Sequence, residues 1–229
     1  MMNTNRTLLG AAIIAAILGA PAAALADPLD RPYGSLATTA PLGKGRFAML
    51  LGGGVAVLLP FFEIQLGYGV AQRVDLVARF ETVVGIFHYP NLAVRWSPID
   101  IGRWKLALDT GVNYSFFGIA TDQVNFTSTF YLTAQVGISG PVTRSTDLVF
   151  AVDNEIDLFD YQSLDGHGSV KGDVHYDATV FRAGMKTRLT EDLEGFARAR
   201  VRIPVETFRY QATSYYVIPS LEIGGTWSW

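Results

Sequence analysis

The amino-acid sequence predicts an all-β fold, an antiparallel transmembrane β-barrel with ten strands. Within the 229-residue chain, ten segments alternate between two kinds of side chain with the period of a β-strand. In eight of these segments the charged residues lie on one face only. The other face is apolar and carries aromatic rings too large to fill the interior of a small barrel. We therefore expect the apolar face to contact lipid.

The first 26 residues have the three-part layout of a secretory signal peptide. Arg6 supplies the positive charge, an apolar core covers 8–20, and a small-x-small pattern predicts cleavage between Ala26 and Asp27. The core is too short to cross a hydrocarbon layer of ~30 Å as a helix. We expect an exported chain, with a retained N-terminal anchor as the alternative.

Composition excludes several kinds of site. Without residues 1–26 the chain keeps 17 of its 18 basic residues and all 21 acidic residues, so its formal net charge is −4. This balance predicts no nucleic-acid partner. The absence of cysteine excludes disulfides and thiolate chemistry. Residues 27–44 mix proline, glycine and polar residues and predict a loose periplasmic segment before a single barrel domain at 45–229.

Ten strands are predicted in this domain, in the order 45–57, 61–71, 74–86, 91–97, 103–116, 128–140, 146–159, 174–188, 193–206 and 215–229. The stretch 47–62 at the start of the domain is uncharged and is broken by three glycines, Gly52–Gly54, and by Pro60, so we expect a strand plus a turn there. The stretch 174–188 changes register between 176–180 and 181–185, which predicts a bulge that turns Arg182, Lys186 and Arg188 inward. Eight strands is the alternative if either stretch lies outside the sheet.

The distribution of charge gives the orientation of the strands. Across eight strands no charge falls on the apolar face and eighteen fall on the other. A lipid-facing Arg or Lys at mid-bilayer costs roughly 2–4 kcal/mol, so the charged face must look toward the barrel axis. The predicted lumen charge network comprises Glu63, Asp75, Arg79, Glu81, Arg95, Lys105, Asp109, Asp147, Asp153, Glu155, Asp157, Arg198, Arg200, Arg202 and Glu222.

The last strand alternates to its end and finishes on Trp229. It resembles the terminal strands of Gram-negative outer-membrane β-barrel proteins, in which the final aromatic residue is part of a signal read by the assembly machinery. The resemblance implies an outer-membrane location, contact with outer-membrane lipid, and recognition of this strand by the barrel-assembly machinery. Two aromatic girdles at the membrane surfaces fit this assignment; they comprise Trp96, Trp104, Tyr114, Phe116, Tyr215, Trp227 and Trp229.

Connection lengths also alternate. The predicted periplasmic turns at 72–73, 98–102, 141–145 and 190–192 are short, and the outer connections 117–127, 160–173 and 207–214 are longer and polar. The first two outer connections, near 58–60 and 87–90, are unusually short.

Two functions follow from a charged lumen. Buried charges need partners, so the interior is expected to be salt-bridged, either as a structural barrel or as a narrow polar pore. Ten strands enclose less space than the 16–18 strands of open porins. We expect no cofactor and no metal site.

The alternative is an enzyme acting on lipid or peptide at the outer rim. Asp173 and His175 have the spacing of one catalytic pair of the omptins, a family of outer-membrane proteases, but no second aspartate pair is evident. His88 and His167 also fall in or beside predicted outer loops.

Overall fold

The computed structural model describes residues 35–117, 126–164, 167–172, 174–204 and 218–229. In these ranges the chain forms one antiparallel sheet, and no helix there is long and apolar enough to cross a membrane. The strands are β1 (Phe47–Ala56), β2 (Leu59–Ala71), β3 (Val74–Val83), β4 (Phe87–Ile101), β5 (Trp104–Phe117), β6 (Phe126–Pro141), β7 (Thr146–Leu164), β8 (His167–Lys171), β9 (His175–Arg188), β10 (Leu193–Pro204) and β11 (Ile218–Ser228).

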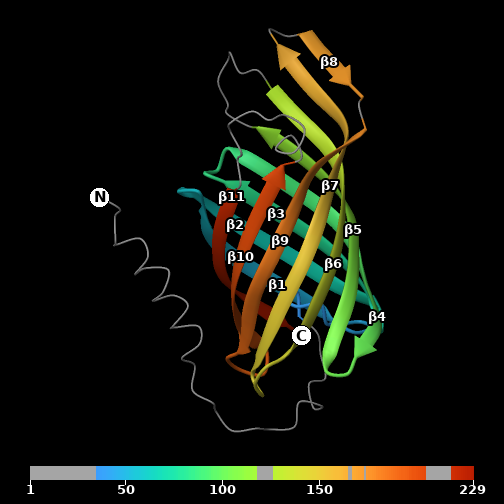
Figure 1. The fold of residues 1–229 in the computed structure, drawn as a ribbon, viewed down its shortest axis with the longest axis vertical. Coiled ribbons are helices and arrows are strands. Elements are labelled where there is room, and N and C mark those ends of the chain that lie inside the picture. Colours follow the sequence, from blue (N-terminus) through green and yellow to red (C-terminus); the bar gives the residue numbers. More distant parts are fainter. Residues whose placement is uncertain (1–34, 118–125, 165–166, 173, 205–217) are drawn as a thin grey trace, which may run out of the picture.

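Ten of these strands close into a barrel (Figure 1). Neighbours pair in the order β6-β5-β4-β3-β2-β1-β11-β10-β9-β7, and β6 also pairs with β7, which completes the ring. Closure removes the unpaired sheet edges that a membrane does not tolerate. The predicted ten-stranded antiparallel barrel is therefore confirmed, and the eight-stranded alternative is wrong.

The remaining strand, β8, forms a hairpin with the far end of β7, beyond the ring. The sequence predicted a loop at 160–173, but β7 continues to Leu164 and β8 begins at His167. Alternation could not reveal this hairpin, because it lies outside the barrel and needs no apolar face.

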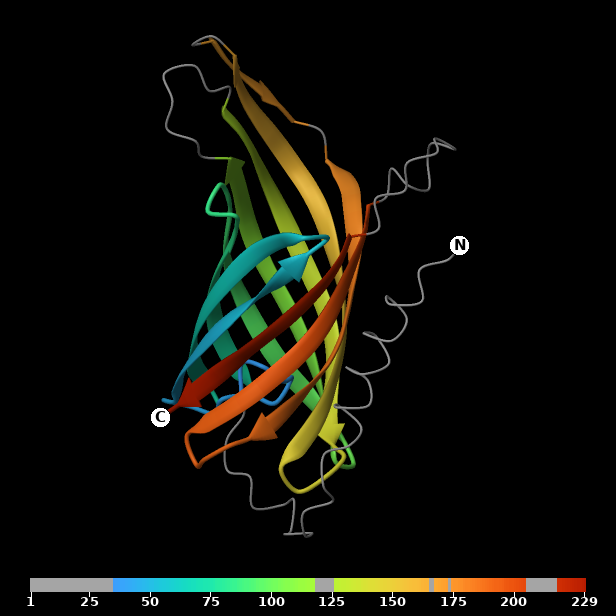
Figure 2. The same ribbon diagram turned by 90° about the vertical axis from the view of Figure 1, so that its left-hand side faces the viewer.

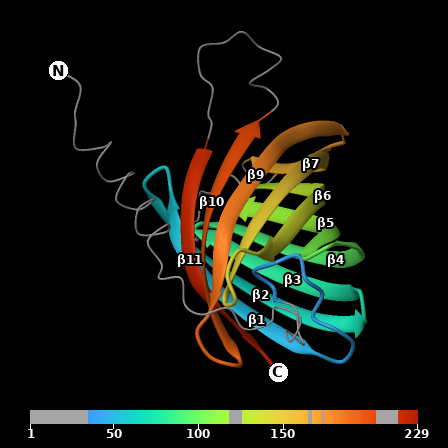
Figure 3. The same ribbon diagram turned by 60° about the horizontal axis from the view of Figure 1, so that its bottom comes forward.

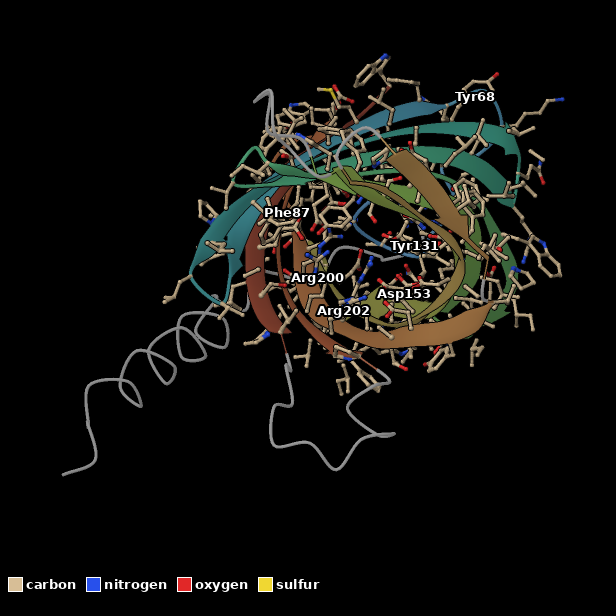
Figure 4. All side chains as sticks on the ribbon, turned by 90° about the horizontal axis from the view of Figure 1, so that it is seen from above. Tyr68, Phe87, Tyr131, Asp153, Arg200 and Arg202 are labelled. Atoms are coloured by element: carbon tan, nitrogen blue, oxygen red, sulfur yellow. The ribbon has the colours of Figure 1, made fainter. Side chains whose placement is uncertain are left out.

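Side-chain exposure alternates as the charge pattern predicted. In β2, Leu66 and Tyr68 are 42% and 48% exposed, whereas Glu63 is 4% exposed. Viewed along the barrel axis, Tyr68 points away from the barrel and Arg200 points into it (Figure 4). Apolar side chains outside and ionic side chains inside are the arrangement of a membrane barrel, the reverse of a water-soluble one.

The course of β4 differs from the prediction. A connection near 87–90 and a turn at 98–102 were expected between alternating segments, yet β4 runs without a turn from Phe87 to Ile101. Pro90 lies where pairing between β4 and β5 skips 89–90, and Pro98 lies in a bulge between Trp96 and Ile99. Both prolines thus occupy places where a backbone N–H is not needed for the ladder.

The register change predicted in 174–188 is present, but it lies nearer the start of the strand. Pairing of β9 with β7 passes from Tyr176 to Ala178, which leaves Asp177 as the extra residue. Ala178 and Val180, expected to share the face of Tyr176, therefore point inward and are buried.

The wall of the barrel is low on one side and tall on the other (Figure 2). On the low side, β1 and β2 are joined by a turn at 57–58, and β3 and β4 by a turn at 84–86. We call β1–β4 with these two turns the low wall, and β6–β9 the tall wall. The described non-glycine residues with positive φ are Val57, Leu58 and Val84, all in the turns of the low wall.

The glycine run predicted as a strand plus turn forms β1 and closes the barrel against β11. A Cβ on Gly54 would overlap the backbone carbonyl of Leu221, and a Cβ on Gly52 would overlap the carboxylate of Glu222. Glycine at these two positions therefore permits a close approach of β1 to its neighbours.

Candidate functional site: a charged lumen with a plugged end

Residues 35–43 lie inside the barrel, at the end that carries the C-terminus, which we call the periplasmic end in keeping with the predicted orientation (Figure 3). The amide of Leu42 donates to both carboxylate oxygens of Asp75 at 3.1 Å. The guanidinium of Arg95 donates to the carbonyl oxygens of Ser35 and Thr38 at 3.4 and 3.1 Å. We call residues 35–43 the plug.

Thr39 also fixes the plug to β4 and β6. Its amide donates to the Ser139 hydroxyl at 3.1 Å, and its carbonyl accepts a hydrogen bond from the Ser97 hydroxyl at 2.9 Å. Leu36 and Leu42 of the plug pack into a buried apolar cluster that includes Phe196 of β10. Contacts with β3, β4, β6 and β10 thus hold the plug on several sides.

A loose segment was predicted at 27–44. For residues 35–43 this prediction is wrong, because they pack inside the barrel; residues 27–34 lie outside the described ranges. All nine plug residues are uncharged, and all but Leu36 and Leu42 are small. Such a composition suits a confined lumen, but it is equally typical of a linker, so the sequence alone did not distinguish the two.

Above the plug, Arg198 of β10 holds two carboxylates. Its Nε donates to Glu222 at 2.5 Å, and its Nη2 donates to Glu222 at 2.9 Å and also to Glu63. Glu63 and Glu222 are only 4% and 3% exposed. Buried carboxylates this close depend on the shared guanidinium for their charge compensation.

The next two inward positions of β10 repeat this arrangement toward the outer end. Arg200 donates to the two carboxylate oxygens of Glu81 at 2.7 and 2.8 Å, a bidentate pair. Arg202 binds Glu155 at 2.9 Å and also Asp177. We call Arg198, Arg200 and Arg202 the arginine ladder; it joins β10 across the lumen to β2, β3 and β7.

Further ion pairs surround the ladder. Arg79 and Arg95 both approach Asp109, at 2.5 and 3.4 Å, and Arg182 binds Asp153 at 2.9 Å. Near the periplasmic end, Lys186 lies 3.1 Å from Asp147 and 2.5 Å from Glu194.

Most of the residues of the predicted network lie where the sequence placed them, with some differences in role. Asp75 and Arg95 face the lumen, but they hold the plug. Lys105 lies at the periplasmic rim, where it pairs with Asp100 at 2.9 Å and both side chains are about 40% exposed. Asp157 lines the outer part of the lumen. The positions that face the lumen are Glu63, Asp75, Arg79, Glu81, Arg95, Asp109, Asp147, Asp153, Glu155, Asp157, Arg198, Arg200, Arg202 and Glu222.

The predicted network omitted Asp177, Arg182, Lys186 and Glu194, which all form ion pairs. The first three lie on β9; Arg182 and Lys186 point inward as the predicted bulge implied, and Asp177 is the bulge residue itself. Arg188, also expected to point inward, is exposed at the periplasmic end of β9.

Toward the outer end the lumen widens into a cavity of about 560 Å³, which we call the outer cavity. Tyr131, Asp153, Arg200 and Arg202 face this space in the axial view (Figure 4). The cavity between the ladder and the plug has a volume of only about 40 Å³. That is room for a few water molecules and for no larger solute.

The aromatic residues of the predicted girdles lie on the outside of the barrel. Trp96 and Trp229 are about half exposed, and the Trp229 ring packs against Phe47 at 5.1 Å between centroids. Trp104 covers Gly140, and Trp227 covers Gly225. Toward the outer end, Tyr114 and Phe116 have ring centroids 5.6 Å apart. Tyr215 lies outside the described ranges.

Of the three histidines considered for a rim enzyme, the structure describes the side chain of His88 alone. His88 lies on the outer surface between the rings of Phe80 and Phe116, at 5.8 and 4.9 Å. Asp173 and the side chains of His167 and His175 lie outside what the structure describes. Within the described residues, no three His, Asp or Glu side chains come together as a possible metal site.

No protein-family model and no curated protein matches the chain. Among solved structures, the barrel is similar to Ail, the attachment invasion locus protein of Yersinia pestis, at 10% identity over 81% of this chain and 99% of that chain, with a TM-score of 0.40. It is similar to NanC porin at 9% identity over 78% and 98% of the two chains, with a TM-score of 0.44. It is also similar to outer membrane phospholipase A from Escherichia coli, at 8% identity over 83% and 95%, with a TM-score of 0.34.

The fold is that of an outer-membrane β-barrel. Closure by ten strands, an apolar outer surface and an ionic lumen carry this assignment. The distant structural likenesses add no argument about activity.

Proposed function

We propose that this protein is an outer-membrane barrel that stands closed, in which ion pairs brace the lumen and the plug blocks a narrow polar passage. One observation carries the proposal: the plug lies below the arginine ladder, and the cavity that Arg198 and the plug line together has a volume of only about 40 Å³. A solute therefore cannot pass through unless the plug moves.

Conductance in planar bilayers tests this proposal. The wild-type protein is expected to be almost silent. The double variant Asp75→Ala/Arg95→Ala removes the side chains that bind the plug backbone at Ser35, Thr38 and Leu42, so it is expected to give small discrete steps.

The matched control is Arg73→Ala, because Arg73 lies at the periplasmic rim, is 49% exposed in its side chain and pairs with Asp100. It should be as silent as the wild type. Steps of equal size in the wild type and the double variant would show that the plug is not the barrier. In the double variant, Glu155→Ala is expected to lower cation selectivity, because Glu155 lines the passage.

The rim-enzyme hypothesis depends on Asp173, His167 and His175 and stays a prediction. Loss of lipid or peptide hydrolysis in His175→Ala would support it. If the wild-type protein hydrolyses neither lipid nor peptide, the enzyme hypothesis is refuted.

A further inference from the structure

The low wall ends in apolar turns at the level where the hydrocarbon of the bilayer ends. Tyr68 pairs with Phe47, whose ring contacts Trp229 of the periplasmic girdle. From Tyr68 to Leu59, β2 climbs nine residue steps; with ~3.4 Å per residue and a tilt of about 40°, this is a rise of about 23 Å. The apolar band of such barrels is about 25 Å tall. The 57–58 turn therefore lies at the outer edge of this band.

The residues in these turns are unusual for their position. Leu58 is 89% exposed, and Val57, Leu58 and Val84 have φ of 58°, 140° and 55°. Glycine and asparagine normally occupy such positions, and a β-branched residue there is strained. Apolar side chains in strained, exposed turns are explained if lipid rather than water covers them.

The low wall is also one side of the outer cavity. Val57, Leu59 and Phe87 line this cavity, and each is at least 40% exposed. Among the described residues, no charged side chain of these two turns separates the cavity from the surrounding lipid. The tall wall rises on the opposite side (Figure 2). The cavity thus has an apolar lateral border and a polar interior.

The wall of the cavity holds two hydrogen-bond acceptors without donors, and near Arg202 the carboxylates outnumber the guanidinium groups. Oδ1 of Asn91 and Oδ1 of Asp153 are buried and have no hydrogen-bond partner, in residues that are 9% and 3% exposed. Glu155 and Asp177 share the single guanidinium of Arg202. Nε of Arg79 and Nε of Arg182 lack acceptors, but both guanidinium groups already bind carboxylates.

We propose that the outer cavity binds the head group of an amine-bearing amphiphile, which moves in sideways from the outer leaflet over the low wall. The ammonium group pairs with the carboxylates of Glu155 and Asp177 and offsets the excess negative charge near Arg202. The apolar tail stays outside, against Val57 and Leu58. A volume of about 560 Å³ lies within the range of small-molecule sites.

The absence of cysteine makes the site easy to probe, because one introduced thiol is unique. Ser115 lines the cavity, and Val170 of β8 is 69% exposed above the barrel. Ser115→Cys and Val170→Cys proteins in phosphatidylcholine nanodiscs would be modified with a small neutral methanethiosulfonate reagent. The rate is compared with and without n-dodecylamine, n-dodecyl sulfate or butylamine.

Dodecylamine is expected to slow modification of Ser115→Cys at least fivefold and to leave Val170→Cys unchanged. Butylamine lacks the tail and dodecyl sulfate lacks the amine, so neither should protect. In the Ser115→Cys background, Leu58→Asp is expected to reduce the protection at least threefold, whereas Val170→Asp, on the tall wall, should not.

Equal protection by dodecyl sulfate would overturn the amine preference, and equal protection by butylamine would overturn the lateral route. Protection that survives Leu58→Asp would also overturn that route. Leu58 is almost fully exposed, so this variant should fold, which migration on a gel without boiling would verify. These outcomes do not depend on whether the barrel conducts ions.

Discussion

Arg198→Ala is the change that most directly probes the lumen. It leaves Glu63 and Glu222 buried without the guanidinium that joins them. Both carboxylates are less than 5% exposed, so water screens them little. Removing one partner of a buried ion pair typically costs about 3–5 kcal/mol, and we expect a loss of unfolding free energy of that size.

A triple variant, Arg198→Ala/Glu63→Gln/Glu222→Gln, supplies the control. It removes both orphaned charges and should recover most of the loss, to within about 2 kcal/mol of the wild type. Unfolding by urea in lipid vesicles, followed by tryptophan fluorescence, measures these differences. Migration on gels with and without boiling verifies that each variant forms a barrel.

A cost below about 1 kcal/mol for Arg198→Ala would refute the reasoning, because that is the range of a solvent-exposed pair such as Arg73–Asp100. The lumen would then be well hydrated around Glu63 and Glu222, and a closed, salt-bridged interior would no longer describe it.

Four further outcomes are expected. Gly54→Ala should prevent β1 from closing on β11 and reduce the heat-modifiable barrel band, whereas Gly53→Ala should reduce it less, because a Cβ there lies 3.3 Å from its nearest neighbour, the Phe61 carbonyl. Val94→Arg, on the lipid face of β4, should cost about 2–4 kcal/mol in urea unfolding, and Val170→Arg on β8 close to nothing. Ser97→Ala removes the hydroxyl that donates to Thr39 and should cost about 1 kcal/mol in the same assay. Trp229→Ala removes the ring that packs on Phe47 and should slow barrel insertion by reconstituted assembly machinery; insertion at the wild-type rate would exclude this residue as part of the signal.

The barrel itself was predictable because lipid imposes a simple rule on its strands. A charge on the lipid face is costly, so the face of Leu66 and Tyr68 is cleared of charge while Glu63 is retained on the other. This rule made register and orientation visible from sequence. It carries no information on elements that avoid lipid, which explains why the plug and the β7–β8 hairpin were missed.

Prolines and bulges account for the remaining differences. Pro90 looks like a turn marker in sequence, but its missing N–H coincides with a gap in the pairing of β4 with β5. The bulge at Asp177 reverses which β9 side chains point inward. Its existence follows from the conflict of two registers, whereas its position depends on pairing with β7. Arg182 and Lys186 were expected to point inward and do so, whereas the inward positions of Asp177, Ala178 and Val180 follow from where the bulge lies.

The arginine ladder joins parts of the chain that lie far apart in sequence. Arg198 and Glu63 are separated by 135 residues, and Arg200 and Glu81 by 119. These partners meet across the barrel axis only after β1 has paired with β11 and closed the barrel. The contacts are therefore expected to form late, after the rate-limiting step of folding. Interactions that are missing from the transition state leave the folding rate unchanged and retard unfolding. The ladder should therefore lower the unfolding rate and prolong the lifetime of the inserted protein. Such kinetic stability matters for a protein that cannot be refolded once it has left the membrane.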